Sequence, residues 1–158
     1  MMIDGAPAPA LMSTIIYQAA ADGAADSAQK LLLTSDEHVV ILRKHVRTLA
    51  LEIKLSLLEQ TKLITAASEL ARNTLKYGGG GLVRTARLAD GARRGIGLSF
   101  IDTGPGITDV EQALTDGFST GGGLGLGLGG ARRLVDEFEI LTNIGKGTAV
   151  TIIKWGYA

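Results

Sequence analysis

The sequence of 158 residues contains no cysteine. Disulfides, thiol nucleophiles and thiolate metal sites are therefore excluded together, and because this suits a reducing compartment we expect a cytoplasmic protein. The net charge is zero, since 16 lysines and arginines balance 16 aspartates and glutamates. Without a basic field, the chain has no general attraction to nucleic acid or to an anionic membrane. Neither is an expected partner.

Long hydrophobic runs and a positively charged start are also missing. No stretch reaches the ~20 apolar residues of a membrane-spanning helix, and the first lysine or arginine is Lys30. We therefore expect neither a membrane span nor a signal peptide. The alanine-rich residues 1–28 are expected to form a loosely ordered N-terminal extension, with a short helical piece around residues 11–21. Residues 29–158 are long enough to bury the core of one domain.

Hydrophobic spacing and capping signals predict the order of the elements. The stretches TSDE (34–37) and SLLE (56–59) each predict a capping box at a helix start. The predicted strands are 29–34, 82–88, 95–101 and two within 137–155, and the predicted helices are 36–53, 57–77, a short one from Thr108 and one that follows the glycine-rich residues 121–130 as far as about Glu137. Asp90-Gly91 and Gly145-Lys146-Gly147 are the expected hairpin turns. This order indicates an α+β domain whose sheet is mixed or antiparallel and carries its helices on one face.

The second long helix carries three polar side chains on one face. In SELARNTLKY (68–77), Glu69, Asn73 and Lys76 fall within an arc of roughly 60°, away from the apolar stripe. One interpretation is an ordinary solvated face. The other is a site for Mg²⁺ and phosphate, in which Asn73 offers a hard oxygen ligand, Lys76 approaches a phosphate and Glu69 accepts a proton from a hydroxyl.

The stretch LSFIDTGPGITD (98–109) fits several kinds of site. An apolar run ending in Asp-Thr-Gly begins an aspartic-protease loop, where Asp102 shares a proton with a second carboxylate. It also fits a nucleotide site, where Asp102 accepts the exocyclic amine of adenine, and Gly104 and Gly106 leave room for the base. A plain turn capped by the aspartate is the third interpretation. Two long helices upstream and Pro105 after the glycine disfavour the all-β protease.

Two further segments are rich in glycine. DGFSTGGGLGLGLGGARRL (116–134) leads into a helix, and the free N–H groups of such a loop and helix start bind phosphate, although a flexible linker has the same composition. The segment lacks the Gly-Lys-Ser/Thr of a phosphate loop and the preceding strand of a dinucleotide fold. After the last turn, the Thr148 hydroxyl stands where it could reach a buried aspartate or an adenine edge.

Taken in order, these motifs resemble the GHKL ATPase superfamily, which includes gyrase, Hsp90, histidine kinases and MutL. They are Glu-x-x-x-Asn on a helix, Asp-x-Gly-x-Gly after a strand, Gly-x-Gly-x-Gly before a helix and Gly-x-Gly-Thr at a hairpin. The resemblance covers about residues 29–155. It implies a single Bergerat-type domain that uses ATP and Mg²⁺, with Asp102 as the adenine reader, and it disfavours the protease.

The resemblance also implies roles for individual residues. Glu69 is the general base toward a protein hydroxyl, Asn73 holds Mg²⁺, and the glycines of 121–127 fold over the triphosphate. The implied nucleotide-binding set is Asn73, Lys76, Asp102, Gly104, Gly106, Ile107, Thr120, Gly121, Gly122, Gly123, Leu124, Gly125, Leu126, Gly127 and Thr148. The chain departs from the family pattern in two respects: the first thirty residues exceed the kinase core, and no lysine or arginine lies between Arg94 and Arg132. Arg72, Lys76 or a partner must then supply any charge that the γ-phosphate needs.

Within the superfamily, the chain is most similar to the small bacterial switch-protein serine/threonine kinases of stressosome pathways. The similarity implies a kinase that phosphorylates STAS-domain antagonist or scaffold proteins, with a second role in activating a PP2C-type phosphatase. An anti-sigma factor that sequesters a sigma subunit is the alternative, and a nucleotide sensor without turnover is disfavoured by the intact Glu69. A histidine kinase is also disfavoured, because neither His38 nor His45 has the His-Glu/Asp-x-x-x-Pro setting of a phospho-acceptor.

Overall fold

The computed structural model describes residues 28–115 and 127–156. Nearly all of the predicted N-terminal extension lies outside these ranges, and so do residues 116–126, which include Thr120 to Leu126 of the predicted site. Within the described part, strands and helices follow one another in the order expected from the sequence. None of the described helices is long and apolar enough to cross a membrane.

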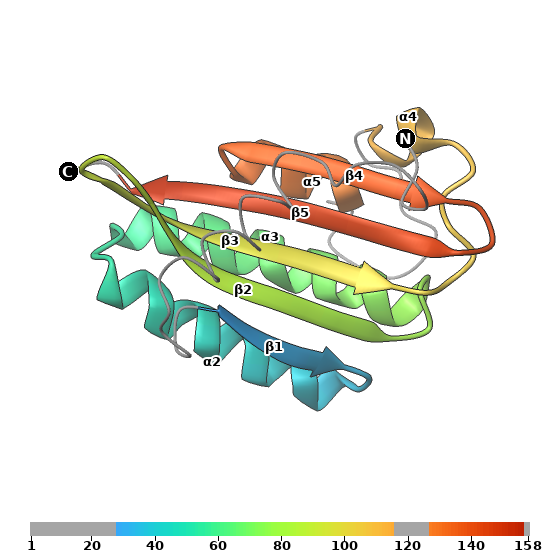
Figure 1. Cartoon of the computed structure of the whole chain (residues 1–158), viewed down its shortest axis with the longest axis horizontal. Coiled ribbons are helices and arrows are strands. Elements are labelled where there is room, and N and C mark those ends of the chain that lie inside the picture. The colour runs from blue at the N-terminus through green and yellow to red at the C-terminus, as the bar shows by residue number, and fades with distance from the viewer. Residues whose placement is uncertain (1–27, 116–126, 157–158) are drawn as a thin grey trace.

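Five strands form one sheet in the order β1-β2-β3-β5-β4 (Figure 1). Every neighbouring pair is antiparallel, so the sheet is antiparallel rather than mixed. The β2–β3 hairpin turns at Gly91, whose φ of 62° favours glycine, as the sequence predicted. The strands are β1 (Ala28–Leu33), β2 (Gly81–Asp90), β3 (Arg93–Asp102), β4 (Glu137–Asn143) and β5 (Gly147–Gly156).

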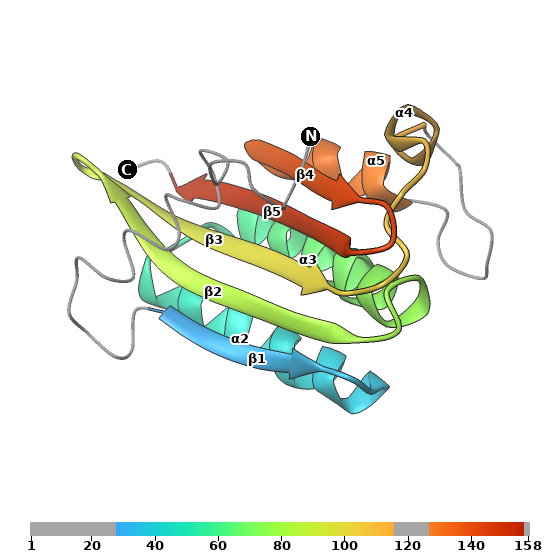
Figure 2. The same cartoon turned by 45° about the vertical axis from the view of Figure 1, so that its right-hand side comes forward.

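Three helices, α2, α3 and α5, pack on one face of this sheet, as expected, and the short α4 lies past its end (Figure 2). The long pair α2 and α3 lie side by side, and α5 packs next to α3. The helices are α2 (Asp36–Glu52), α3 (Leu57–Lys76), α4 (Val110–Ala113) and α5 (Gly127–Leu134). The predicted helix through Glu137 was too long, because α5 ends at Leu134 and Glu137 already begins β4.

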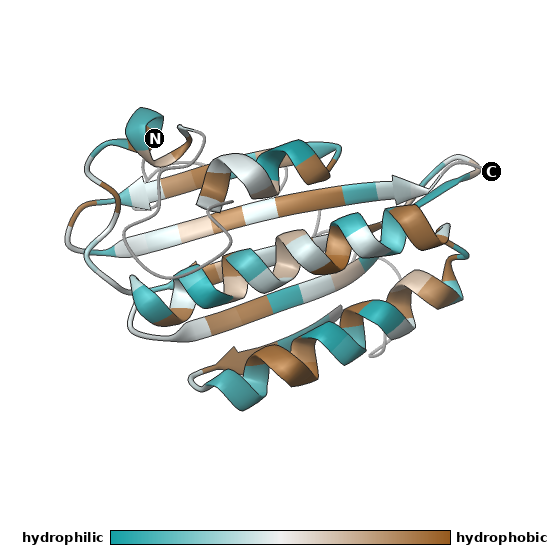
Figure 3. Ribbon diagram, turned by 180° about the vertical axis from the view of Figure 1, so that it is seen from behind, coloured by the Kyte–Doolittle hydropathy of each residue, from teal (hydrophilic) through white to brown (hydrophobic). Residues whose placement is uncertain are grey.

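The main core lies between the helices and the sheet. Hydrophobic and hydrophilic residues alternate along α2 and α3 (Figure 3), and the buried ones include Val39, Val46, Leu63 and Leu70. Leu42, Leu70 and Phe100 are among the largest fully buried side chains. Burying such a side chain stabilises the fold by about 1.5–3 kcal/mol each.

The two predicted capping boxes have different outcomes. Ser56 caps α3 as expected, because its Oγ accepts the Glu59 N–H at 3.1 Å. The box at 34–37 was wrong, since the N-cap of α2 is Ser35 and its side chain makes no capping hydrogen bond. The Thr34 N–H instead donates to Nδ1 of His38 at 3.0 Å, so an imidazole takes the place of the expected carboxylate.

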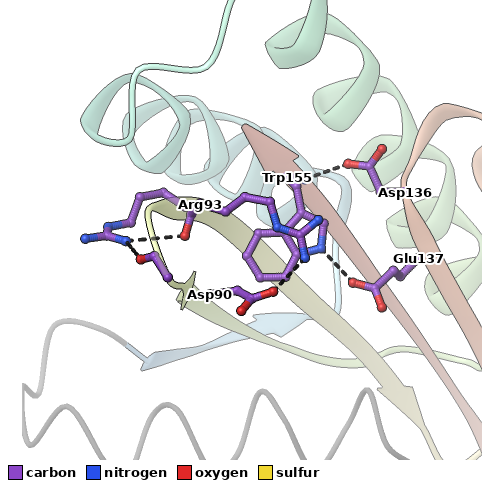
Figure 4. Close-up of polar contacts among 7 residues, drawn as sticks. Asp90, Arg93, Asp136, Glu137 and Trp155 are labelled. Carbon is purple, nitrogen blue, oxygen red and sulfur yellow. Dashed lines mark hydrogen bonds and ion pairs between the residues drawn. The ribbon is translucent and has the colours of Figure 1, made fainter. Parts of the chain in front are cut away.

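A buried lysine joins three elements at the end of the sheet away from the predicted site. The Lys154 ammonium on β5 pairs with the carboxylates of Glu59 at the start of α3 and Asp136 just before β4. Burial alone would lower the pKa of Lys154, but the hydrogen bond and charge of Glu59, with those of Asp136, raise it above its usual value. Asp136 also accepts the backbone N–H of Trp155 at 2.6 Å (Figure 4). We call Lys154, Glu59 and Asp136 the lysine cluster.

Candidate nucleotide-binding site

Asp102 is the last residue of β3, where the central strand opens into the loop toward α4. Its Oδ1 accepts the Gly104 N–H at 2.8 Å, which fixes the carboxylate within a tight turn. Burial raises the pKa of Asp102, and hydrogen bonds from the backbone N–H groups of Gly104 and Thr148 oppose that rise. The side chain is half-buried, so this is a partly desolvated acceptor of the kind that suits an amine donor.

Glycines surround this carboxylate closely. A Cβ at Gly78 would lie 2.5 Å from Cγ of Asp102, and a Cβ at Gly104 would lie 2.8 Å from the Cα of Gly78. Gly147 touches the same residue from β5, where a Cβ would meet the Asp102 carbonyl oxygen. Side chains at these positions would push the aspartate out of place. The sequence analysis predicted a role at the site for Gly104 but not for Gly78, because a glycine at that place only indicates the end of a helix.

The second predicted glycine of the loop, Gly106, has a φ of 82°, and a Cβ there would lie 2.7 Å from the Asn143 carbonyl oxygen. The next residue, Ile107, donates its backbone N–H to Oγ1 of Thr142 at 2.8 Å. Both contacts attach the loop to the end of β4. The loop after Asp102 is therefore held by the neighbouring hairpin, which leaves it in a fixed position beside the aspartate.

Thr148 takes part in the same network, and of the two partners that the sequence suggested for its hydroxyl, the adenine edge stays a prediction. Its Oγ1 lies 3.0 Å from Oγ1 of Thr142, so the hydroxyl bonds to a neighbouring strand rather than to Asp102. The backbone N–H of Thr148 is the group that interacts with the carboxylate. The sequence analysis did not predict a role for Thr142. Threonine is common in strands, so its presence there does not indicate that it holds a neighbouring loop.

The polar face of α3 ends beside Asp102, since Gly78 directly follows the helix. Glu69 is only 6% exposed, and its Oε1 accepts from Nη1 of Arg72 at 3.0 Å. Asn73 is half-buried, one turn further along. Lys76 is exposed, with its Nζ 5.3 Å from the centre of the Tyr77 ring. The solvated-face interpretation is therefore wrong for Glu69, because a carboxylate on such a face would be open to water.

Among the described residues, the structure brings Asp102, Gly104, Gly106, Ile107 and Thr148 together at one end of the sheet. Asp102, Gly104 and Gly106 lie against the C-terminal end of α3 on one side and the β4–β5 hairpin on the other. Gly127 starts α5, which packs on α3. The remaining predicted positions, Thr120 and Gly121 to Leu126, lie outside the described residues.

This arrangement fits adenine and the phosphates of ATP. The glycines let the backbone close around Asp102 without displacing its side chain, and the carboxylate offers an acceptor for the amine of adenine. Among the described residues, no group of three or more histidines, aspartates and glutamates forms a metal site. Asn73 suits Mg²⁺ all the same, because this ion is usually held by one or two protein oxygens together with substrate phosphates.

Comparisons with known proteins agree with this geometry. The family described as histidine kinase-, DNA gyrase B-, and HSP90-like ATPase matches residues 58–155. The serine/threonine-protein kinase RsbT of Bacillus subtilis (strain 168) is 42% identical over 117 residues, which cover 74% of this chain and 88% of RsbT.

A solved structure of the RsbU and RsbW domains of a Mycobacterium tuberculosis protein matches with a TM-score of 0.56 at 21% identity. That match covers 80% of this chain and 32% of the longer chain, and it shows the fold alone. Family membership rests on the sequence. With the family match over residues 58–155 and the identity to RsbT along most of its length, the chain belongs to the GHKL ATPases and, among them, to the family of the RsbT serine/threonine-protein kinase.

Proposed function

We propose that the chain transfers the γ-phosphoryl group of ATP to a serine or threonine of a STAS-domain protein in a partner-switching stress pathway. The observation that carries this proposal is the buried carboxylate of Glu69, one helical turn before Asn73. A protein hydroxyl needs a base before it can attack a phosphorus atom, whereas an imidazole does not. The printed name of RsbT, a serine/threonine-protein kinase, supports the same chemistry.

The proposed roles follow from the order of side chains along α3. Glu69 accepts the proton of the substrate hydroxyl, whose oxygen forms the new bond to the γ-phosphorus as the bond to the β–γ bridging oxygen breaks and ADP leaves. Asn73 holds Mg²⁺, which neutralises phosphate charge when bound. Asp102 orients the adenine, and Thr142 supports it indirectly by holding the loop at Ile107.

We propose that cationic side chains of α3 neutralise the negative charge of the γ-phosphate. No lysine or arginine lies between Arg94 and Arg132, so the segment that precedes α5 brings no cation. Arg72 lies 3.0 Å from Glu69 through Nη1, and its side chain is about half exposed. We propose that it orients the Glu69 carboxylate and turns toward the phosphate when ATP is bound, with Lys76 as the second cation.

The phosphorylated STAS-domain protein is then released, and the kinase is free for its second proposed partner, a PP2C-type phosphatase that it activates. The alternative partner is a sigma subunit. Pull-down from a host lysate with the full chain as bait, followed by mass spectrometry, distinguishes these partners. Stoichiometric recovery of a sigma subunit, without a STAS-domain protein or a phosphatase, would contradict the proposed pathway.

The direct test is transfer of labelled phosphate from ATP to a STAS-domain protein encoded by the same organism. Glu69→Gln should lower the transfer rate by at least 100-fold, because a positioned general base contributes about 10²–10⁴-fold. ATP affinity, measured by calorimetry, should change by less than threefold in the same variant. Loss of both properties would show that Glu69 serves the site's structure, and retained transfer would exclude it as the base.

A further inference from the structure

The sheet has a second face, opposite the helices, which we call the outer face. Strand register defines it. Thr85 and Arg87 of β2 contact His45 and Glu52 of α2, so their side chains point toward the helices. Side chains alternate along a strand, and directly paired residues share a face. Ala86 and its neighbours in the adjacent strands therefore belong to the outer face.

The outer face has an apolar patch beside a polar row, with glutamates on β4 at its edge and little relief at its centre. Its rows of paired residues are Leu82, Ile101 and Ala149; Arg84, Ser99 and Thr151; Ala86, Gly97 and Ile153; and Leu88, Gly95 and Trp155. In the last two of these rows the β3 residue is a glycine, so no side chain stands between β2 and β5 there. Such a surface accepts a flat or helical apolar segment.

These side chains are withdrawn from water. Ile153 is 1% exposed and Ala86 is fully buried, and both belong to a hydrophobic cluster with Leu88 and Trp155. Ser99 and Thr151 are buried as well and bond to each other through their hydroxyls. An isoleucine on the open side of a bare sheet would be largely exposed, so the burial of this cluster requires a cover.

No helix of residues 28–115 or 127–156 supplies that cover. Of these helices, α2, α3 and α5 lie on the opposite side of the sheet, and α4 lies past its end (Figures 1 and 3). Arg93 covers part of the cluster, since its guanidinium carbon lies 4.0 Å from the centre of the Trp155 ring (Figure 4). The row of Ala86 and Ile153 lies one row further from Arg93 than Trp155 does.

The N-terminal segment has the length, position and composition for this role. It comprises the 27 residues before β1, which is the edge strand next to β2. Within LMSTIIYQA (11–19), a helical arrangement would place Leu11, Met12, Ile15 and Ile16 on one side and Ser13, Thr14 and Tyr17 on the other. This provides one apolar stripe for an otherwise open apolar face.

The charges of the N-terminal segment complement those at the β1–β2 edge of the outer face. The segment carries Asp4, Asp22 and Asp26 but no lysine or arginine. Lys30 and Arg84 pair across β1 and β2 on the outer face, and both side chains are exposed. Asp22 and Asp26 come shortly before β1 in the sequence, and Lys30 and Arg84 make the β1–β2 edge of the outer face basic, whereas Glu137 and Glu139 make its β4 edge acidic.

We propose that residues 1–27 dock on the outer face of their own chain and cover the Ala86–Ile153 cluster through the apolar side of 11–19. The occupant is part of this chain, and the docking does not depend on the proposed kinase activity. A second copy of the chain and a different partner protein are the competing occupants that the experiment distinguishes.

Thiol reactivity in the full chain tests the cover. The chain has no cysteine, so Ser99→Cys introduces a single thiol at the centre of the outer face. Its labelling rate with a small disulfide reagent should rise at least tenfold when Ile15→Asp and Ile16→Asp are added. The matched control, Ser13→Asp with Thr14→Asp, adds the same charge on the polar side and should leave the rate unchanged.

Ser68→Cys reports on the main core, because Ser68 is buried on α3. Its thiol should stay unreactive when Ile15→Asp and Ile16→Asp are combined with it. An equal rise at both thiols, or none at Ser99→Cys, would overturn the proposal, as would an equal rise with the control pair.

Photocrosslinking gives a second test that needs no destabilising change. A benzophenone amino acid at position 16 in the full chain should crosslink to β2, β3 or β5 of the same molecule, and the same group at position 14 should not. Mixing isotopically light and heavy protein separates the occupants. Crosslinks between light and heavy chains would assign the face to a second copy, and crosslinks to other elements would also contradict intramolecular docking.

Discussion

At the scale of single residues, the site depends on where one carboxylate is held. Asp102 is fixed by the Gly104 N–H at 2.8 Å and enclosed by glycines on three sides. Its pKa lies above the usual value of 3.8 because burial outweighs the two backbone hydrogen bonds. The ionised carboxylate therefore does not stabilise the fold in the absence of ligand, and we assign its charge to nucleotide binding.

Asp102→Asn should weaken ATP binding at least tenfold, because a hydrogen bond to a charged group is worth about 1.5–3 kcal/mol. The fold should not lose stability. Because burial raises the pKa of Asp102, the charged form is the less favourable one in the empty fold, so removing the charge should cost no stability at pH 7. Calorimetric titration with Mg-ATP and urea unfolding of both proteins check the two statements. A marked loss of stability with unchanged affinity would contradict them.

Gly78→Ala should lower ATP affinity without touching ATP itself. The new Cβ would lie 2.5 Å from Cγ of Asp102, so the carboxylate must move. The matched control is Gly79→Ala, where a Cβ has free space but φ is 73°, so the substitution costs about 1 kcal/mol of stability without reaching the aspartate. Calorimetry should show weaker binding for the first variant only. Equal affinities would indicate that the aspartate tolerates displacement.

At the scale of elements, α2 is attached to the sheet by a histidine. Nε2 of His45 lies 3.0 Å from Oγ1 of Thr85 on β2. Burial lowers the pKa of His45 below 6.5, and the nearby charge of Glu52 only partly opposes it. The folded chain therefore favours the neutral imidazole.

The free energy of unfolding should fall as pH drops from 7.5 to 5.5, because His45 binds its proton more readily in the unfolded chain. Its contribution is complete above 6.5 and is lost as the pH falls toward the lower folded pKa. His45→Gln should flatten this part of the urea-unfolding profile. A slope that survives in His45→Gln would assign it to another group.

At the scale of the whole molecule, the lysine cluster connects α3, the approach to β4 and β5 at the end of the sheet away from Asp102. The Lys154 side chain is 6% exposed, whereas Glu59 and Asp136 retain 20% and 25%. Replacing the lysine would leave two partly buried carboxylates without their shared cation. Breaking such a pair is far more costly than losing an exposed one.

Lys154→Met should lower the free energy of unfolding by about 3 kcal/mol, at the lower end for a buried pair because its partners keep some contact with water. Arg87→Met removes the exposed pair with Glu52 and should cost at most about 1 kcal/mol. Urea unfolding compares the two. ATP affinity should be unchanged in Lys154→Met, since the cluster lies outside the site. Equal stability losses would show that burial adds nothing to the lysine cluster.

The sequence by itself determined the elements and the site motifs, because both depend on local spacing. Helical and alternating periodicity, turn glycines and the Ser56 cap are properties of short stretches, and they predicted the order of strands and helices along the chain. The same holds for Glu69 and Asn73, one turn apart on a helix, and for Asp102 at a strand end.

Only the tertiary structure decided which distant residues meet. Strand order places β5 beside β3, so Thr148 pairs with Asp102 across 46 positions of sequence, and the end of α3 brings Gly78 against the same carboxylate. The burial of Glu69, the support from Thr142 and the failed cap at Thr34 depend equally on such contacts. Periodicity specifies which side of an element is apolar, but the packing of elements far apart in the chain specifies what that side touches.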